Sequence, residues 1–166
     1  MSYANVFEAK AINEGATPKY SVSLIIPKSD KKTVKAIKDA IEEAKVAGTA
    51  KFGGKIPANL KTPLRDGDED RPDDEAYQDS YFINANSVTR PAVVDEDLHP
   101  IMDPSEFYSG CYGRASVNFY AYNANNTSKG IAAGLNNLQK LGEGDRLGGG
   151  STAAEDFGSS DGDDLL

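Results

Sequence analysis

Residues 112–122 read Tyr-Gly-Arg-Ala-Ser-Val-Asn-Phe-Tyr-Ala-Tyr, and their chemistry alternates with a period of two. Alternate side chains of a β-strand point to opposite faces of the sheet. The odd-numbered positions are small or apolar, and they are Gly113, Ala115, Val117, Phe119 and Ala121. The even-numbered positions carry three tyrosines, an arginine and two small polar groups, namely Tyr112, Arg114, Ser116, Asn118, Tyr120 and Tyr122. The stretch predicts a strand whose odd face suits a core.

The even face differs from an ordinary exposed strand face, which would carry lysine, glutamate and threonine. Flat aromatic rings beside a guanidinium suit stacking on unpaired bases, with the cation close to phosphate. Two alternatives stay open. Tyrosines are good strand residues on any half-buried surface, and they also suit the interface of a homodimer.

The composition predicts one soluble globular domain. Hydrophobic residues make up 39% of the 166-residue chain and charged residues 27%, and a chain of this length can bury a substantial core. No apolar run approaches the roughly 20 residues that span a membrane, and the first residues lack the pattern of a signal peptide. Cys111 is the only cysteine, so we expect no internal disulfide and a cytoplasmic location.

The net charge of −8 is unevenly distributed. No Lys or Arg follows Arg146, and the last 14 residues hold five acids, Glu155, Asp156, Asp161, Asp163 and Asp164. Without those five, 18 basic residues face 21 acidic ones, so the body can form a local cationic groove. We predict a glycine-rich linker over 142–152 and a disordered acidic tail over 153–166, because the tail has too few apolar residues to fold alone.

The remaining pattern predicts a mainly β protein with one inserted α-helix. The helix is expected over 31–47, where apolar residues recur every three or four positions after a capping Ser29 or Asp30. The segment 129–141 has features of both helix and strand, and its two glycines favour strand. The other expected strands are 19–26, 81–88, 92–95 and a short one within 3–12.

The sequence offers no convincing catalytic or metal-binding motif. The acids between Asp66 and Glu75 do not fit a calcium-binding loop, since Arg71 stands where glycine is needed and Tyr77 where glutamate is needed. A magnesium-dependent nuclease is an alternative, but its ligands must converge on a rigid frame, and these acids follow one another in a loop. His99 is predicted to lie in a surface loop. We therefore expect no enzyme activity, no metal and no cofactor.

The chain resembles the phage-encoded single-stranded DNA-binding proteins built on an OB-fold. The resemblance rests on the order and spacing of short segments spread over residues 2–141, namely 2–8, 18–28, 63–68, 81–85, 90–91, 108–112 and 130–136. It implies an OB-fold, a five-stranded β-barrel with an inserted helix, over 1–141. It also implies sequence-independent binding of single strands in phage DNA replication or recombination, within the host bacterial cytoplasm.

The predicted binding residues follow from this interpretation. Bases would stack on Tyr112, Tyr120, Tyr122 and Phe82, while phosphates would contact Arg114, Arg90, Arg65, Lys61 and Lys129. The tail would compete with DNA for the cationic groove and recruit replication or recombination proteins through Asp161, Asp163, Asp164, Leu165 and Leu166. The alternative function is an acidic DNA-mimicking or protein-interaction module, which the net charge of −8 favours.

Overall fold

The computed structural model describes residues 1–11 and 13–147. Within them, the strands are β1 (Ser2–Lys10), β2 (Lys19–Pro27), β3 (Leu64–Asp66), β4 (Ser80–Ser87), β5 (Ala92–Val94), β6 (Tyr112–Ala124) and β7 (Ser128–Gly142). The α-helices are α1 (Lys31–Ala47) and α2 (Gly67–Asp70), and short 3₁₀ helices are η1 (Thr49–Phe52), η2 (Glu75–Tyr77) and η3 (Pro104–Glu106). None of the helices in these two ranges is long and apolar enough to cross a membrane. The predicted tail residues, Asp161, Asp163, Asp164, Leu165 and Leu166, lie outside the described residues.

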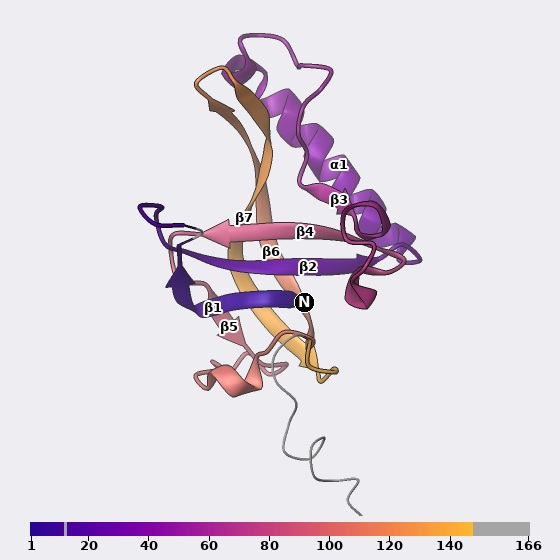
Figure 1. Cartoon of the computed structure of the whole chain (residues 1–166), viewed down its shortest axis with the longest axis vertical. Coiled ribbons are helices and arrows are strands. Elements are labelled where there is room, and N and C mark those ends of the chain that lie inside the picture. Colours follow the sequence, from indigo (N-terminus) through magenta and orange to yellow (C-terminus); the bar gives the residue numbers. More distant parts are fainter. Residues whose placement is uncertain (12, 148–166) are drawn as a thin grey trace, which may run out of the picture.

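The strands form one strongly curved sheet in the order β1-β2-β4-β7-β5, with β6 paired to β7 and β3 to β4 (Figure 1). Neighbouring pairs are antiparallel, except that β7 runs parallel to β4 and to β5. The expected mainly β barrel with an inserted helix is confirmed, and the barrel is nearly closed. Its five long strands are β1, β2, β4, β6 and β7, and the three-residue strands β3 and β5 are added to them.

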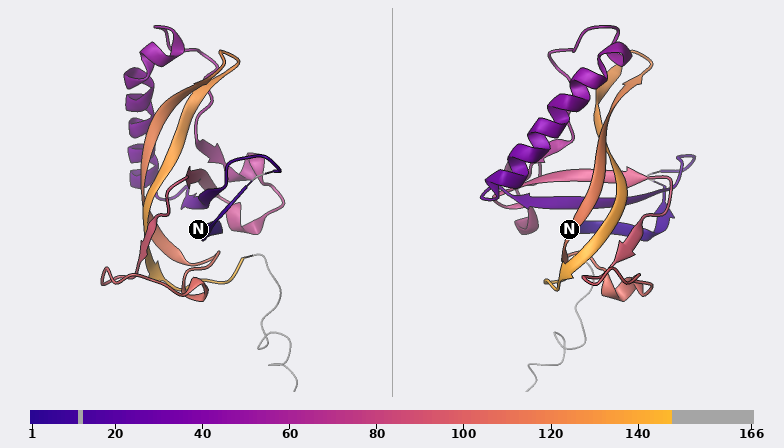
Figure 2. Two further views of the ribbon diagram at one scale, coloured as in Figure 1. Left: turned by 90° about the vertical axis from the view of Figure 1, so that its left-hand side faces the viewer. Right: turned by 180° about the vertical axis from the view of Figure 1, so that it is seen from behind.

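The inserted helix α1 packs against the upper arm of the β6–β7 hairpin, as the two side views show (Figure 2). Its buried residues are Val34 and Ile41, and the Asp30 side chain caps its start by accepting a hydrogen bond from the Thr33 amide. Ile41 joins a small core with Phe52, Ala121 and Ile131. Gly48 ends the helix, and a Cβ there would lie 2.2 Å from the Ala121 Cβ. This close approach requires glycine.

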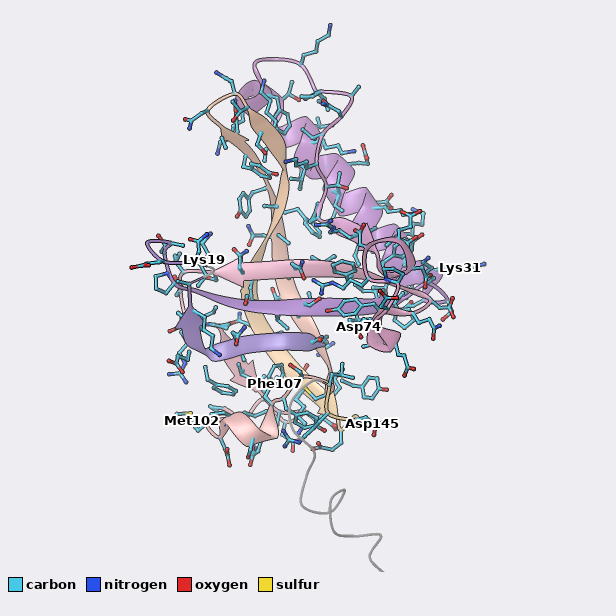
Figure 3. The ribbon with its side chains drawn as sticks, viewed as in Figure 1. Lys19, Lys31, Asp74, Met102, Phe107 and Asp145 are labelled. Atoms are coloured by element: carbon cyan, nitrogen blue, oxygen red, sulfur yellow. The ribbon has the colours of Figure 1, made fainter. Side chains whose placement is uncertain are left out.

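The main core lies inside the barrel, where the apolar positions of β1, β2, β4 and β7 meet. Val6, Val22, Ile83 and Leu138 are each almost completely buried. Phe107, labelled beside the lower end of the sheet in Figure 3, closes that end with Cys111, which is fully buried.

The segment 63–75 differs from the exposed loop that the sequence predicts. Leu64 of β3 pairs with Ile83 of β4 and packs against the main core, which anchors the segment to the barrel. Two of its acids are then held by one lysine, because the Lys28 ammonium lies 2.8 Å from a carboxylate oxygen of both Asp66 and Asp68. Lys28 is therefore the structural partner of these two acids.

Candidate nucleic-acid interface

Strand β6 has the two-faced character that its sequence predicts. Its even-numbered side chains are exposed from Tyr112 to Tyr120, with Tyr112 67% and Tyr120 43% exposed, and Tyr122 is half-buried. The odd-numbered residues face inward, and Ala121 is 8% exposed. The prediction for both faces of this strand is confirmed.

Small residues of β7 lie opposite the tyrosines and form the floor of the face. Tyr122 pairs with Gly130, Tyr120 with Ala132, and Asn118 with Gly134, and residues paired across antiparallel strands share a face. The Tyr122 and Asn118 side chains lie close to the two glycines, and a Cβ on Gly130 would also lie 2.6 Å from the Lys61 backbone carbonyl. A Cβ on Gly130 would lie 2.7 Å from the Tyr122 hydroxyl, and one on Gly134 would lie 2.7 Å from the Asn118 Oδ1.

The small residues of this floor share one continuous outer face with the tyrosine rings. The sequence already contains the signal for it, because Gly130, Ala132 and Gly134 alternate with the buried residues Ile131, Ala133 and Leu135. Sequence reasoning misses it, because it uses the glycines only to argue against a helix. The face continues onto β4, where Asn86 pairs with Gly134.

Arg114 is fixed over the lower part of this outer face. Its Nε donates a hydrogen bond of 2.6 Å to Oε1 of Gln139, its near neighbour on β7. The Gln139 amide in turn donates to the backbone carbonyls of Asp95 and Glu96. Among the described residues, no carboxylate pairs with Arg114, so its guanidinium charge is available to a ligand.

Lys61 comes to the upper end of the same face. It forms a backbone bridge to Gly130, and a Cβ on Gly130 would lie 2.9 Å from the Lys61 Cβ as well as close to the Tyr122 hydroxyl. Its ammonium donates a 3.3 Å hydrogen bond to the Ser128 hydroxyl. Lys61 and Arg114 therefore place one cation near each end of the row of tyrosines.

The other predicted cations lie elsewhere. Lys129 pairs with Asn123, on the opposite face of the hairpin from Tyr122, and its ammonium donates to the Phe52 carbonyl in η1. Arg65 pairs with Asp70 at 2.8 Å, and Arg90 is exposed in the turn between β4 and β5. The structure does not bring these three into contact with the tyrosines.

The prediction that bases stack on Phe82 is wrong, because this residue is only 1% exposed. The strand alternation places it on the outer side of β4 as expected, but that end of the sheet is covered. The Tyr77 ring packs edge-on against Phe82 at 5.0 Å, and the Arg71 guanidinium lies 5.2 Å from the Phe82 ring. Tyr77 is itself buried, and its hydroxyl donates to the Ser23 hydroxyl. Alternation shows which way a side chain points, but not what covers it.

A short segment after β7 is fastened beside Tyr112, at the lower end of the face. The Tyr108 hydroxyl hydrogen-bonds to the Glu143 carboxylate and the Gly144 carbonyl, and the Arg146 guanidinium lies 4.4 Å from the Tyr108 ring. The Leu147 amide donates to the Ser109 carbonyl. Hydrogen bonds from Lys140 and Tyr108 lower the pKa of the Glu143 carboxyl below its usual value. A Cβ on Gly144 would lie 3.0 Å from the Tyr112 ring, so this segment passes next to that ring.

The histidine lies in an exposed loop, as expected. His99, Asp95 and Asp97 place their ligand atoms within 4.8 Å of one another. However, Asp95 Oδ1 accepts hydrogen bonds from the backbone amides of Asp97 and His99. That carboxylate therefore stabilises the loop.

The barrel and its tyrosine-bearing outer face define the class to which the chain belongs, the OB-type barrels with an aromatic sheet surface. The chain belongs to the family described as Enterobacter phage Enc34, ssDNA-binding protein, whose model matches residues 1–166.

Individual relatives agree with this family. The chain is 31% identical over 168 residues to putative protein p50 of Acyrthosiphon pisum secondary endosymbiont phage 1, covering 95% of this chain and 88% of that protein. It is similar to the single-stranded DNA-binding protein from bacteriophage Enc34 in complex with ssDNA, with a TM-score of 0.76, 28% identity, and coverage of 89% of this chain and 84% of the other. The gp2.5 protein of bacteriophage T7, a single-stranded DNA-binding protein, shares the fold at a TM-score of 0.59 and 17% identity, over 94% of this chain and 88% of that one.

Proposed function

We propose that this protein binds single-stranded DNA without sequence preference during phage DNA replication and recombination, in the host bacterial cytoplasm. The observation that carries the proposal is the row of tyrosines on β6 above a floor of glycine and alanine. Bases would stack on Tyr112, Tyr120 and Tyr122, and each stacked base contributes about 1–3 kcal/mol. The family membership supports the same ligand.

Arg114 and Lys61 would contact phosphates at the two ends of this face. Such contacts release counterions from the nucleic acid, so they make affinity depend on salt concentration. Arg90 and Arg65 lie in exposed positions from which they could meet a longer strand. Lys129 lies on the opposite face of the hairpin from Tyr122, so it would not meet a strand stacked on the tyrosines.

The direct test is fluorescence anisotropy with labelled single-stranded and double-stranded oligonucleotides over a range of salt concentrations. We expect retention of single strands at moderate salt and weaker binding of duplex, since paired bases offer no free ring faces. An acidic DNA-mimicking or protein-interaction module would retain neither. The use of the tyrosines in a homodimer contact predicts instead that replacing them lowers the mass of the protein in solution.

We also propose that the acidic tail over 153–166 regulates this binding and recruits proteins. The support is positional, because the segment 143–147, which precedes the tail in the sequence, lies beside Tyr112 and Ser109. Its carboxylates would compete with phosphates for Arg114, and Leu165 and Leu166 would dock on a replication or recombination protein. Deleting residues 153–166 should tighten DNA binding, most strongly at low salt. Unchanged or weaker binding would overturn this role, and replacing the five acids by amides is the matched control for tail length.

A further inference from the structure

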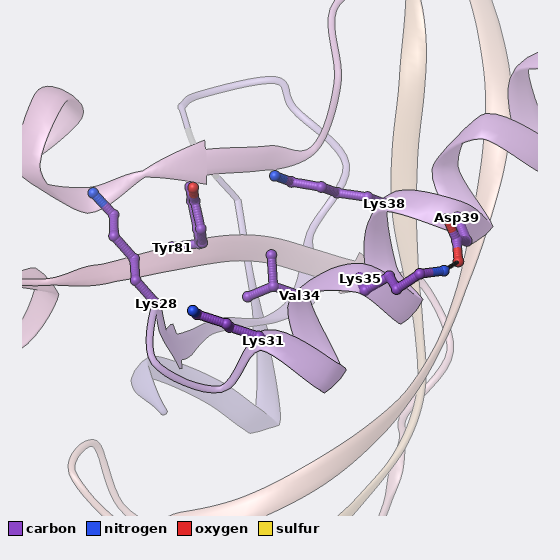
Figure 4. A pocket seen from close by; sticks show the side chains of 7 residues that line it. All are labelled: Lys28, Lys31, Val34, Lys35, Lys38, Asp39 and Tyr81. Carbon is purple, nitrogen blue, oxygen red and sulfur yellow. Dashed lines mark hydrogen bonds and ion pairs between the residues drawn. The ribbon is translucent and has the colours of Figure 1, made fainter.

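A second cationic site lies away from the tyrosines, beside the start of α1. It is a pocket of about 430 Å³ lined by Lys28, Lys31, Val34, Lys35, Lys38 and Tyr81, with Asp39 at its edge (Figure 4). Figure 4 shows Lys28 and Lys38 on either side of the Tyr81 ring. Their ammonium groups lie 5.3 Å and 5.5 Å from the ring centroid. The pocket therefore gathers positive charge around one phenol group.

The lysines are brought together by their spacing along the helix. Lys31, Lys35 and Lys38 follow one another at four and three residues, which places them on one face of α1. Residues 31–38 contain four lysines and no acid, whereas the acids of the helix begin at Asp39. Charge is thus segregated along α1, and the cationic half is the one that borders the pocket.

Two of the four pocket lysines already have acidic partners. Lys28 pairs with Asp66 and Asp68, whose hydrogen bonds raise its pKa and keep it charged, and Lys35 pairs with Asp39 at 2.7 Å. Within the part of the chain that the structure describes, Lys31 and Lys38 have no carboxylate partner. Lys31 and Lys38 are therefore the charges available to a ligand, and the Tyr81 hydroxyl adds a hydrogen-bond donor.

The pocket and the tyrosine face lie on opposite sides of the sheet. Tyr81 shares its side of β4 with the core residues Ile83 and Ala85, and residues of α1 lie beside Tyr81 on that side. Asn86, by contrast, pairs with Gly134 and belongs to the outer face. A ligand in the pocket would therefore leave the tyrosines free.

We infer that this pocket binds backbone phosphates of single-stranded DNA, at a point on the strand beyond the segment stacked on the tyrosines. The lining favours phosphate oxygens over an apolar peptide side chain. Its one aliphatic residue, Val34, is already buried, at 8% exposed, so a leucine would find no hollow to fill. The inference rests on the proposed function. It extends the proposed path of the DNA strand from the tyrosine face to the pocket beside α1.

The test compares the double variant Lys31→Gln/Lys38→Gln with the control Lys32→Gln/Lys45→Gln, which removes the same charge from the same helix outside the pocket. Each is titrated with two oligonucleotides. One OB-fold covers roughly 4–16 nucleotides, so a strand of about 6 nucleotides lies near the lower end of this range and a strand of about 24 exceeds it. For the long strand, the pocket variant should lose about 5–10-fold in affinity at low salt. Its slope of log affinity against log salt should fall by about 1.4, or about 0.7 for each phosphate that is no longer neutralised. Binding of the short strand should not change.

Two results would overturn the inference while leaving the proposed function intact. One is equal binding of the long strand by pocket variant and wild type. The other is tighter binding by the pocket variant, which would assign the pocket to the acidic tail. Failure of the wild type to bind either strand would instead overturn the proposed function. Acetylation footprinting of the unmodified protein gives an independent readout, in which the long strand should protect Lys31 and Lys38 and the short strand should not.

Discussion

The tyrosine face and the lysine pocket show two ways of presenting a surface to a polyanion. On the face, the tyrosines follow one side of strand β6 opposite small residues of β7, and the cation Arg114 is held by Gln139. In the pocket, the charges are ammonium groups on long side chains, and those of Lys28 and Lys38 lie 5.3 Å and 5.5 Å from the Tyr81 ring centroid. Stacking requires rigid, accessible planes, whereas charge attraction tolerates mobile groups. The two regions should therefore respond differently to salt and to substitution.

The largest effect should come from removing rings on the face. Tyr120→Ala/Tyr122→Ala should lower the affinity for single-stranded DNA by at least about 30-fold, because each stacked base contributes about 1–3 kcal/mol. The slope of log affinity against log salt should stay unchanged, in contrast to the pocket variant. Anisotropy titrations at several salt concentrations measure both quantities. Tyr120→Phe/Tyr122→Phe is the control, since it keeps the rings, and a similar loss there would show that hydroxyl groups rather than stacking carry the binding.

Phe82 should show the opposite behaviour to the exposed tyrosines. Phe82→Ala should lower the free energy of unfolding by about 3–5 kcal/mol, the usual cost of emptying a buried aromatic site. Chemical denaturation measures this change. The milder Phe82→Leu variant keeps the fold for binding assays and should retain wild-type affinity. A large loss of DNA binding by folded Phe82→Leu protein would return Phe82 to the interface.

A smaller loss of affinity for single-stranded DNA is expected from enlarging a small residue of β7 without changing charge. Ala132→Leu places a bulky side chain opposite Tyr120 and should reduce affinity by about 10-fold by blocking the base, equivalent to about 1.4 kcal/mol. The thermal midpoint should change little, because the new side chain points to the outside. Ala132→Ser is the matched control that leaves the floor low. Wild-type affinity in the leucine variant would mean that bases do not enter from this side.

The smallest effect concerns the ion pairs that border the pocket. Hydrogen bonds from Lys28 lower the pKa of both Asp66 and Asp68. A depressed carboxyl pKa stabilises the fold above the unfolded value of about 3.9. This contribution is lost as the pH falls through the lower, folded values. The difference in thermal midpoint between wild type and Asp66→Asn/Asp68→Asn should therefore shrink below about pH 4. Asp73→Asn, an exposed acid of the same segment, should show no such trend.

The sequence predicts the two faces of β6 well, because alternation depends only on the order of residues along one strand, and the barrel itself is implied by the family resemblance. It predicts Lys61 and Arg114 as cations of the interface, and the structure places both beside the tyrosine row. It fails for Phe82, whose cover comes from Tyr77 in a segment that carries no strand or helix pattern. It also misses the pocket, because Tyr81 and the lysines of α1 meet only through the packing of the helix on the barrel.

Strand β7 is paired with β4, β5 and β6, and its bridge to Lys61 adds a further connection. Its partners on β4 lie about fifty residues earlier in the chain, as in the pairing of Ala85 with Ala133. Closing such a long loop slows folding. During synthesis, β4 can gain this partner only after residues around 133 have left the ribosome. Until then the part of this edge around Ala85 and Asn86, beyond the pairing with β3, is open to wrong pairing. Gly130 and Gly134, which lie opposite Tyr122 and Asn118, therefore belong to the strand that is synthesised last and completes the sheet.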